Sequence, residues 1–462
     1  MTTMERAAEM ARATPSNRNR YVDFLRAASI LVVVVGHWLM AAPVMTASGL
    51  VVDNLLSHNT WTHYLTWVVQ VMPIFFFVGG FANAASWRRA RDLGDGYPAW
   101  LRARLRRLVL PVLPLLAVWA GGGWLLLRAG VDAGLLGLGS QAALVPVWFL
   151  AAYLTVVALT PLTLRVWERY GFASLVVTAA LAAAADLSML AAGIGWAGYL
   201  NYLFVWATVH GLGYAWADGR MGKVATRLRA SVAGLIATAG LVALGPYPVA
   251  MVGLDTMGVT NSQPPKVTLV ALAVFQIGLL LALEKPARRF LAGEKPWAAT
   301  ILVNGRIMTI YLWHLTAMVT VIGLAALAGG SGLSINPDTS VWWLTRPLWI
   351  GLLALATLPF LLAFGRYERP GSDRRPAPIW WRPILAVVAT TAGLALLARY
   401  GIADREGLHG IALTLPFAAA VAGGIGGARL WERRRRRPHQ SETGKATSQA
   451  GSSGPIVSQS AK

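Results

Sequence analysis

The chain has 462 residues, of which 56% are hydrophobic and only 13% are charged. Soluble proteins average about 25% charged residues, so this composition indicates a membrane protein. The formal net charge of +21 could suggest nucleic-acid binding, but the arginines stand in short segments between apolar runs, which argues against that class. The chain has no cysteine, which excludes disulfides, thiolate catalysis and cysteine-based metal sites.

Apolar runs recur along the chain, and a run of about 20 residues is long enough to cross a bilayer as a helix. We therefore expect an all-α fold, a polytopic transmembrane helix bundle of about twelve spans. The twelve expected spans lie near residues 24–42, 64–84, 108–127, 146–164, 171–191, 199–217, 230–252, 267–283, 299–322, 344–364, 383–399 and 410–430.

The arginines and lysines fall in alternate connections, which predicts the topology. The basic segments are residues 1–22 and the connections at 87–107, 165–170, 218–229, 284–296 and 365–382. Few cations occur in the connections at 43–63, 128–145, 192–198, 253–265 and 323–343. The positive-inside rule then places both termini in the cytoplasm of a multi-pass protein of the inner or plasma membrane. A cleaved signal peptide at the N-terminus is the alternative, which the many later spans disfavour.

Four regions follow from this pattern. Residues 1–22 form a cytoplasmic N-terminal segment, and residues 23–364 form the transmembrane core. Residues 365–430 hold two more transmembrane helices with a basic cytoplasmic loop. Residues 431–462 open with the run "WERRRRRPHQ" and then become rich in Ser, Gly and Gln, which predicts a basic and then disordered cytoplasmic tail.

The first span carries two ionisable residues, Arg26 and His37. Their spacing of eleven residues is close to three helical turns, so both side chains share one face, about 16 Å apart along the axis. Arg26 would lie at the cytoplasmic edge and His37 beyond the bilayer centre. Ionisable groups within a membrane usually face an internal cavity, and an imidazole is suited to proton transfer near neutral pH. The pair fits an elongated anionic ligand held at Arg26 with its reactive end near His37.

A purely structural interpretation remains open for each of the two. Arg26 could extend to the inner surface as a topology signal, and His37 could bond a neighbouring helix. His210 and Asp186 have the same structural alternative, and Asp23 is expected to cap the first helix and could orient Arg26. Trp61, Trp342 and Trp343 fall at the outer boundary, where an interfacial aromatic belt is a more economical explanation than sugar stacking.

Several short motifs resemble those of the acyltransferase 3 membrane acyltransferases. An Arg or Lys, ten residues and then His in the first membrane helix is their hallmark, and "RAASILVVVVGH" fits it. The flanking "YVDFLR", and then "MPIFFFVGGF", "RARLRRLVLPVLPL", "VPVWFLAAYL" and "IYLWHL", resemble further family motifs in the same order over residues 20–365. One departure is Gly79-Gly80, where the family often has Ser-Gly, so any role of that serine hydroxyl is missing here.

The resemblance implies acyl transfer across the membrane. The donor would be cytoplasmic acyl-CoA, by default acetyl-CoA, and the acceptor a hydroxyl on the outer side, commonly of a carbohydrate. Arg26, Arg104 and Arg107 would bind the phosphates of the donor, since arginine binds phosphate bidentately. For Arg104 and Arg107 a plain topology signal is the alternative, and for Arg88, Arg89 and Arg91 it is the interpretation that we favour.

His37 would act as the general base, with a covalent acyl-histidine as the variant mechanism. His314, in "IYLWHL", would orient the acceptor or stabilise the oxyanion, or else be a packed structural histidine. No metal is expected, because H-E-x-x-H and CxxC patterns are absent from the sequence. The competing function is a transporter or flippase for a glycolipid or small molecule, which would also use buried polar groups and a basic inner face.

Overall fold

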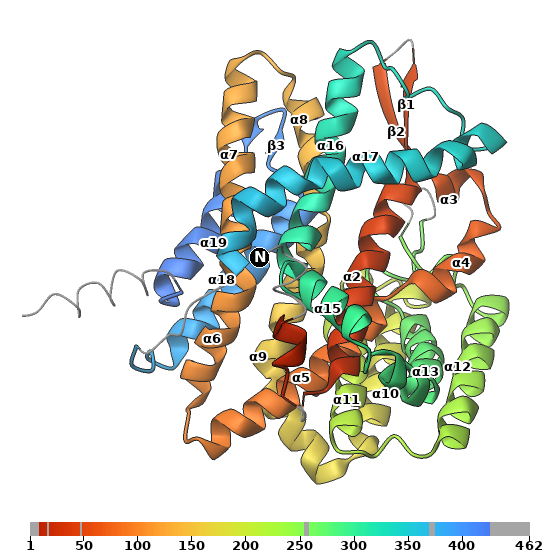
Figure 1. Ribbon diagram of the computed structural model, residues 1–462, viewed down its shortest axis with the longest axis vertical. Coiled ribbons are helices and arrows are strands. Elements are labelled where there is room, and N and C mark those ends of the chain that lie inside the picture. Colours follow the sequence, from red (N-terminus) through yellow and green to blue (C-terminus); the bar gives the residue numbers. More distant parts are fainter. Residues whose placement is uncertain (1–8, 16–17, 47–48, 254–257, 369–374, 426–462) are drawn as a thin grey trace, which may run out of the picture. The chain divides into compact units, whose positions relative to one another are not determined.

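The computed structural model (Figure 1) describes residues 9–15, 18–46, 49–253, 258–368 and 375–425. The predicted disordered tail at 431–462 and the end of the last expected span, residues 426–430, lie outside the described residues. The described part is a bundle of helices with two small β-hairpins, which confirms the all-α class.

The helices follow the apolar runs of the sequence. They are α2 (Arg20–Met40), α3 (Leu55–His58), α4 (Thr62–Val69), α5 (Met72–Asp92), α6 (Tyr97–Val109), α7 (Val112–Arg128), α8 (Ala133–Leu144), α9 (Pro146–Tyr170), α10 (Phe172–Leu190), α11 (Asn201–Ala217), α12 (Val224–Leu244), α13 (Val267–Ala282), α14 (Glu284–Phe290), α15 (Glu294–Asn304), α16 (Ile307–Leu327), α17 (Ser340–Phe364), α18 (Trp381–Tyr400) and α19 (Gly410–Ala422). Short 3-10 helices lie at η1 (Gly195–Leu200) and η3 (Gly365–Glu368).

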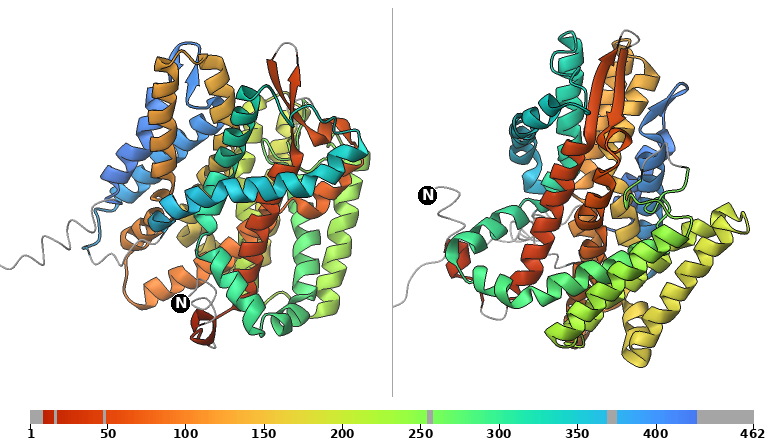
Figure 2. Two further views of the ribbon diagram at one scale, coloured as in Figure 1. Left: turned by 45° about the horizontal axis from the view of Figure 1, so that its top comes forward. Right: turned by 90° about the vertical axis from the view of Figure 1, so that its right-hand side faces the viewer.

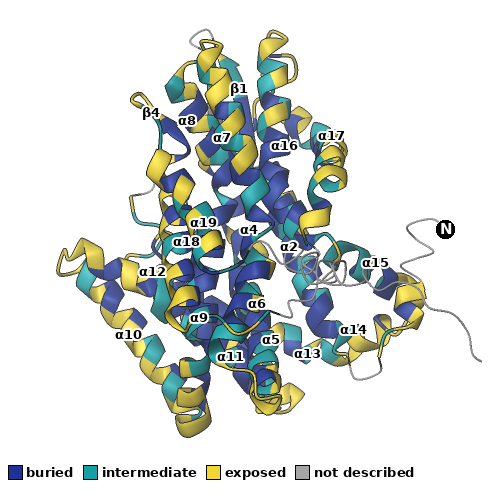
Figure 3. Ribbon diagram, turned by 90° about the vertical axis from the view of Figure 1, so that its left-hand side faces the viewer, coloured by how far each residue is buried: buried dark blue, intermediate teal, exposed yellow. Residues whose placement is uncertain are grey.

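Among these helices, eight are long and apolar enough to cross a membrane, and two bent pairs, α6–α7 and α13–α14, raise the count to ten. The two other expected spans correspond to α11, which has 17 residues, and α19, which has 13 described residues. The outward faces of α10 and α12 in Figure 3 carry exposed apolar side chains, such as Val176 on α10 and Ile236 on α12. Such faces suit contact with lipid.

Two connections and the start of one span differ from the sequence prediction. Residues 43–63 contain an antiparallel hairpin of β1 (Ala41–Thr46) and β2 (Gly49–Asn54), and residues 128–145 contain α8. The ninth span begins at Ile307 rather than near 299, because Gly305 and Arg306 interrupt the helix and separate α15 from α16. Hydropathy does not reveal that break, since α15 is itself rich in apolar residues.

The β1–β2 hairpin continues directly from α2 and is tied to the loop before α17. His58 contacts Asp53 of the hairpin through Nε2 at 2.7 Å and Asp338 through Nδ1 at 3.2 Å. A neutral imidazole has one N–H, so both contacts can be hydrogen bonds to carboxylates only when His58 is protonated. We call the end of the bundle that carries this hairpin the hairpin end.

Helix α2 packs against α5, α15, α16 and α17. The views in Figure 2 show α17 crossing α2 and α16 rather than running beside them, which brings its first turns next to the end of α2 that leads into the hairpin. Trp349 of α17 donates from Nε1 to the carbonyl oxygen of Trp38 at 2.9 Å. The second half of α2 is therefore enclosed by α16 and α17.

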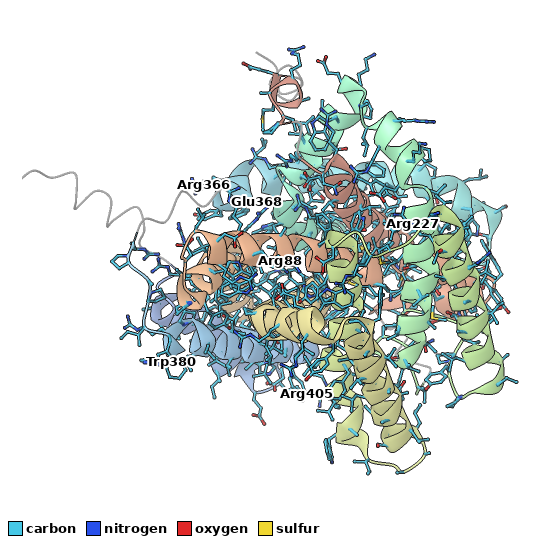
Figure 4. All side chains as sticks on the ribbon, turned by 90° about the horizontal axis from the view of Figure 1, so that it is seen from below. Arg88, Arg227, Arg366, Glu368, Trp380 and Arg405 are labelled. Atoms are coloured by element: carbon cyan, nitrogen blue, oxygen red, sulfur yellow. The ribbon has the colours of Figure 1, made fainter. Side chains whose placement is uncertain are left out.

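The opposite end of the bundle, which we call the basic end, holds the α5–α6, α11–α12 and α13–α15 connections. Arg88 and Arg227, labelled in Figure 4, lie there: Arg88 pairs with Asp218 at 2.6 Å and Arg227 with Glu284 at 3.3 Å. Glu368, also labelled, accepts from the backbone N–H groups of Met308 and Thr309 at 2.8 and 3.1 Å and so caps α16.

Candidate active site

His37 of α2 and His314 of α16 form a direct pair within the bundle. His37 Nδ1 lies 2.9 Å from His314 Nε2, and the two rings are parallel to within 5°. His314 is fully buried, whereas His37 is half-buried. The two histidines that the sequence singled out separately therefore belong to one hydrogen-bonded unit.

The surrounding bonds decide which nitrogen carries each proton. His314 Nδ1 lies 2.7 Å from the carbonyl oxygen of Tyr311, and a carbonyl can only accept, so this nitrogen carries the proton. In a neutral ring, His314 Nε2 is then an acceptor, and His37 Nδ1 must be the donor to it. The lone pair of the neutral His37 ring is consequently on Nε2, the nitrogen that points away from His314.

Fixed bonds on neighbouring residues hold this pair in place. Trp38 donates from Nε1 to the carbonyl oxygen of His314 at 3.1 Å. The hydroxyl of Tyr311 donates to the carbonyl oxygen of Pro146 at 2.8 Å, and Trp119 Nε1 donates to Thr316 Oγ1 at 3.1 Å. These bonds join α2, α7, α9 and α16 around the pair and so fix the positions of the two backbones that carry the rings.

Arg26, at the other end of the same helix face, is held on two sides. It donates from Nη2 to Asp23 at 2.8 Å and from Nε to Oδ1 of Asn304 at 2.8 Å. Asn304 in turn donates to the backbone carbonyl of Asp23 at 2.9 Å, and Arg18 pairs with the same carboxylate at 2.7 Å. Asn304 ends α15 and His314 is on α16, so Arg26 and His37 both face the α15–α16 segment.

Arg104 and Arg107 lie on α6, next to Arg26. Arg104 contacts the hydroxyl of Ser86 on α5, and its guanidinium lies 5.8 Å from the ring centre of Trp100. Tyr153 of α9 is within electrostatic range of all three arginines, Arg26, Arg104 and Arg107. Arg104 is half-buried and Arg107 is exposed. Helices α2 and α6 thus bring three cations together around Tyr153 of α9 at the basic end.

Tyr153 and Asn304 are polar residues of this site to which the sequence analysis gave no role. A Cβ built on Gly79 would lie 2.7 Å from the Tyr153 ring and 2.9 Å from its hydroxyl. A serine at Gly79 would therefore require the Tyr153 side chain to shift. The signal for both residues was available: Tyr153 is a polar group in the apolar run of the fourth expected span, and Asn304 in that of the ninth.

Asp186 lies elsewhere, in a bonded network of its own, whereas His210 is linked to the arginine site, because its partner Asn83 also donates from Nδ2 to the Tyr153 hydroxyl at 3.2 Å. His210 contacts the Tyr214 hydroxyl at 2.9 Å and Asn83 at 3.2 Å. Asp186 accepts from Asn201 at 2.8 Å and from the backbone N–H of Val267 at 2.7 Å. Among the residues that the structure describes, no group of three or more His, Asp or Glu side chains is placed to hold a metal ion.

One prediction about a surface residue needs correction. Trp342 was expected in an aromatic belt at the membrane surface, but it is only 1% exposed and packs inside the protein. Trp61 is 53% exposed, and its ring centre lies 5.7 Å from that of Trp343. Arg88 and Arg91, which we interpret as topology signals, also pair with Glu168, at 3.1 and 3.7 Å.

Comparison with known proteins gives one match. A family model described as an acyltransferase domain matches residues 19–366, a segment that holds every residue of the two clusters described above except Arg18. No curated protein and no solved structure matches the chain.

Proposed function

The chain belongs to the acyltransferase family whose model matches residues 19–366, and from that membership we propose that it moves an acyl group from acyl-CoA to a hydroxyl group across the membrane. It is a membrane acyltransferase in general terms, since the family domain coincides with the apolar helices. The finer proposal is that the donor is cytoplasmic acetyl-CoA and the acceptor an extracytoplasmic carbohydrate or glycoconjugate.

The cations of the basic end support the choice of donor. CoA carries its phosphates at one end and its thioester at the other, joined by the long pantetheine arm. Arg26, Arg104 and Arg107 would hold the phosphates, because guanidinium groups bind phosphate oxygens bidentately. With Arg26 and His37 about 16 Å apart along α2, the extended arm would carry the thioester toward the histidine pair.

The single observation that carries the mechanism is the hydrogen bond from His37 Nδ1 to His314 Nε2. It leaves the lone pair of His37 Nε2 available to accept a proton from the acceptor hydroxyl as its oxygen attacks the thioester carbonyl. The carbon–sulfur bond then breaks, and the CoA sulfur takes up the proton that His37 received. In the variant mechanism, Nε2 itself attacks the carbonyl, the carbon–sulfur bond breaks, and the CoA thiolate leaves behind an acyl-imidazolium. The acceptor oxygen then attacks the acyl carbon, the carbon–nitrogen bond breaks, and the thiolate takes up the hydroxyl proton.

His314 serves in this proposal as a positioning residue. Its Nδ1–H is bonded to Tyr311 and its Nε2 to His37, so neither nitrogen is free to donate to an oxyanion. It would hold the tautomer and the ring plane of His37, as a buried carboxylate does for the histidine of a catalytic triad.

The proposed setting is a multi-pass protein of a bacterial inner membrane with both termini in the cytoplasm. Arg88 and Arg227 lie at one end of the bundle (Figure 4), and the positive-inside rule assigns that end to the cytoplasm. The hairpin end would then face the acceptor, on the outer side, where surface polysaccharide is modified by O-acetylation.

The test uses the full-length protein in sealed proteoliposomes. Labelled acetyl-CoA is supplied on the side of the basic end and an oligosaccharide on the other, and transfer of label to the oligosaccharide is measured. We expect transfer that requires both substrates and is lost in His37→Ala. Movement of a sugar lipid without acetyl-CoA, with no transfer of label, would instead identify a transporter or flippase.

A further inference from the structure

Arg346, on the second turn of α17, is a buried cation that the proposed reaction does not use. It is 8% exposed, and its Nη1 has no hydrogen-bond partner among the described residues. Its Nε donates to the backbone carbonyl of Trp342 at 3.3 Å, which satisfies one of five N–H groups. A guanidinium that merely reached for the membrane surface would place its head in water, and this one does not.

Two tryptophans border this guanidinium. Its central carbon lies 4.1 Å from the ring centre of Trp342 and 5.5 Å from that of Trp349. Cation–π attraction stabilises the buried charge in part, but an aromatic face accepts no conventional hydrogen bond from the unpaired Nη1. With one face covered by Trp342, the N–H edge of the guanidinium is the part left for a ligand.

Arg346, Trp342 and Trp349 line a small pocket of about 10 Å³ together with Pro43 of β1 and residues 332, 333 and 335. None of the lining residues is acidic, so the pocket holds a positive charge with no countercharge of its own. A cavity needs about 10–15 Å³ to hold one water molecule. The pocket therefore has room for one small polar group, such as a carboxylate oxygen of a larger molecule.

The pocket adjoins the histidine pair. Trp349, which lines it, donates to the carbonyl oxygen of Trp38, the residue that follows His37. Trp38 in turn donates to the carbonyl oxygen of His314. The pocket also includes Pro43, six residues beyond His37, and therefore lies at the hairpin end, on the side where the acceptor would approach.

We propose that Arg346 binds a carboxylate of the acceptor, so that the acceptor is a carboxylate-bearing carbohydrate such as a uronic-acid glycan. This inference rests on the proposed function. The N–H edge of a guanidinium matches a planar carboxylate in a bidentate, charge-assisted pair. A carboxylate bound at Arg346 would direct a neighbouring hydroxyl of the same molecule toward His37. The Arg346–carboxylate ion pair would thereby select the acceptor.

The first test compares two acceptors that differ only in the carboxylate, a glucuronate-terminated and a glucose-terminated oligosaccharide. Transfer from acetyl-CoA is measured in proteoliposomes for the wild type, Arg346→Met, Arg346→Lys and Arg128→Met. Arg128 is the matched control, because it lies over Trp124 with the same four-residue spacing but is exposed. The compared quantity is the ratio of kcat/KM for the glucuronate-terminated acceptor to kcat/KM for the glucose-terminated one. We expect this ratio to exceed one in the wild type and to fall at least 10-fold in Arg346→Met.

Arg346→Lys keeps the positive charge but loses the planar guanidinium that binds a carboxylate through two N–H groups. Its ratio should therefore fall between those of the wild type and Arg346→Met. Arg128→Met should keep the wild-type ratio. An unchanged ratio in Arg346→Met, with both acceptors slowed equally, would overturn the carboxylate site while leaving the acyltransferase proposal intact.

A second test does not depend on turnover. The melting temperature of each purified protein is measured with glucuronate, with glucose and in vesicles containing phosphatidylglycerol. Glucuronate should raise the melting temperature of the wild type but not of Arg346→Met, even if acetyl-CoA proves not to be the donor. If only phosphatidylglycerol stabilises the protein, and this stabilisation requires Arg346, the pocket binds a lipid phosphate and the proposal is overturned. Absence of stabilisation by both glucuronate and phosphatidylglycerol would also overturn it.

Discussion

His37 and His314 stand 277 residues apart in the chain, and their ring nitrogens lie 2.9 Å apart in the fold. Each histidine sits on a long apolar helix, and each had a structural interpretation when considered alone. In our proposal His37 is the general base, and His314 holds its tautomer and orientation through this hydrogen bond.

Removing His37 should remove the base. We expect His37→Ala to lower kcat about 100- to 10,000-fold, the range that general-base catalysis contributes. Acetyl transfer by the purified protein measures this. The control is His409→Gln, since His409 pairs with Asp404 at 3.0 Å outside residues 19–366 and should be dispensable. Comparable activity in His37→Ala and His409→Gln would exclude His37 as the base.

Changing His314 should affect the state of His37 rather than substrate binding. His314→Ala leaves the Nδ1–H of His37 without its acceptor, so we expect a lower kcat, an unchanged KM for acetyl-CoA and an altered pH–rate profile. His314→Gln offers a side-chain oxygen that can accept the same hydrogen bond and should restore part of the rate. A profile identical to that of the wild type in His314→Ala, after matching the amount of folded protein, would rule out the positioning role.

The basic end should govern affinity for the donor. Arg104→Gln removes a cation but no ion pair of the fold, and a hydrogen bond to a charged group is worth about 1.5–3 kcal/mol. We therefore expect KM for acetyl-CoA to rise about 10- to 100-fold with little change in kcat. Arg169→Gln is the control, because Arg169 is exposed at the end of α9. Equal KM values for the two variants would remove Arg104 from the donor site.

The β1–β2 hairpin should respond to pH through His58. Hydrogen bonding to Asp53 is the main cause that raises the pKa of His58, and Asp338 adds to it. Although burial opposes the shift, hydrogen bonds from Asn54 and His58 hold the pKa of Asp53 below its usual range. His58 therefore stabilises the fold below its unfolded pKa and stops doing so as pH rises through its raised folded pKa. Asp53 contributes above its unfolded pKa and stops as pH falls through its lowered one.

The contribution of this cluster is thus greatest between the unfolded-state pKa of Asp53 and that of His58, and it is lost outside the two folded-state pKa values. We expect the melting temperature of the wild type to exceed that of His58→Gln within this window, and the difference to shrink on both sides of it. Thermal unfolding of both proteins across a pH series is the measurement. A difference that does not vary with pH would show that His58 acts by packing alone.

Close helix packing should make Gly80 irreplaceable. A Cβ at Gly80 would lie 1.9 Å from the carbonyl oxygen of His210, and one at Gly213 would lie 2.2 Å from that of Phe77, so α5 and α11 touch through their backbones. We expect Gly80→Ala to destabilise the protein by about 1–3 kcal/mol or more. Gly121→Ala on α7, where a Cβ meets no atom within 4 Å, should be tolerated. Equal melting temperatures for the two variants would contradict this packing.

The sequence was most informative where one helix carries the pattern. Arg26 and His37 share a face because eleven residues complete about three turns, and that periodicity is local. The basic connections and the apolar runs were visible for the same reason. The break at Gly305 was not visible, since the apolar composition continues through it.

The partners of these residues could not be read from the sequence. Asn304 meets Arg26 and His314 meets His37 only because α15 and α16 fold back against α2. The burial of Trp342 depends likewise on α17 crossing α2, and a hydropathy profile assigns tryptophan near a span end to the membrane surface. Long-range packing decides such contacts, and a single sequence does not record it.

The histidine pair also sets an order of events in biosynthesis. Helix α2 leaves the ribosome early, but its hydrogen-bond acceptor arrives with α16, 277 residues later. At about 5–20 residues per second, translation takes roughly 15–55 seconds to cover that interval. During this time the first helix is already in place with an imidazole that lacks its counterpart. A nascent chain released before α16 is therefore incomplete at its reactive centre, however many of its other helices have been inserted.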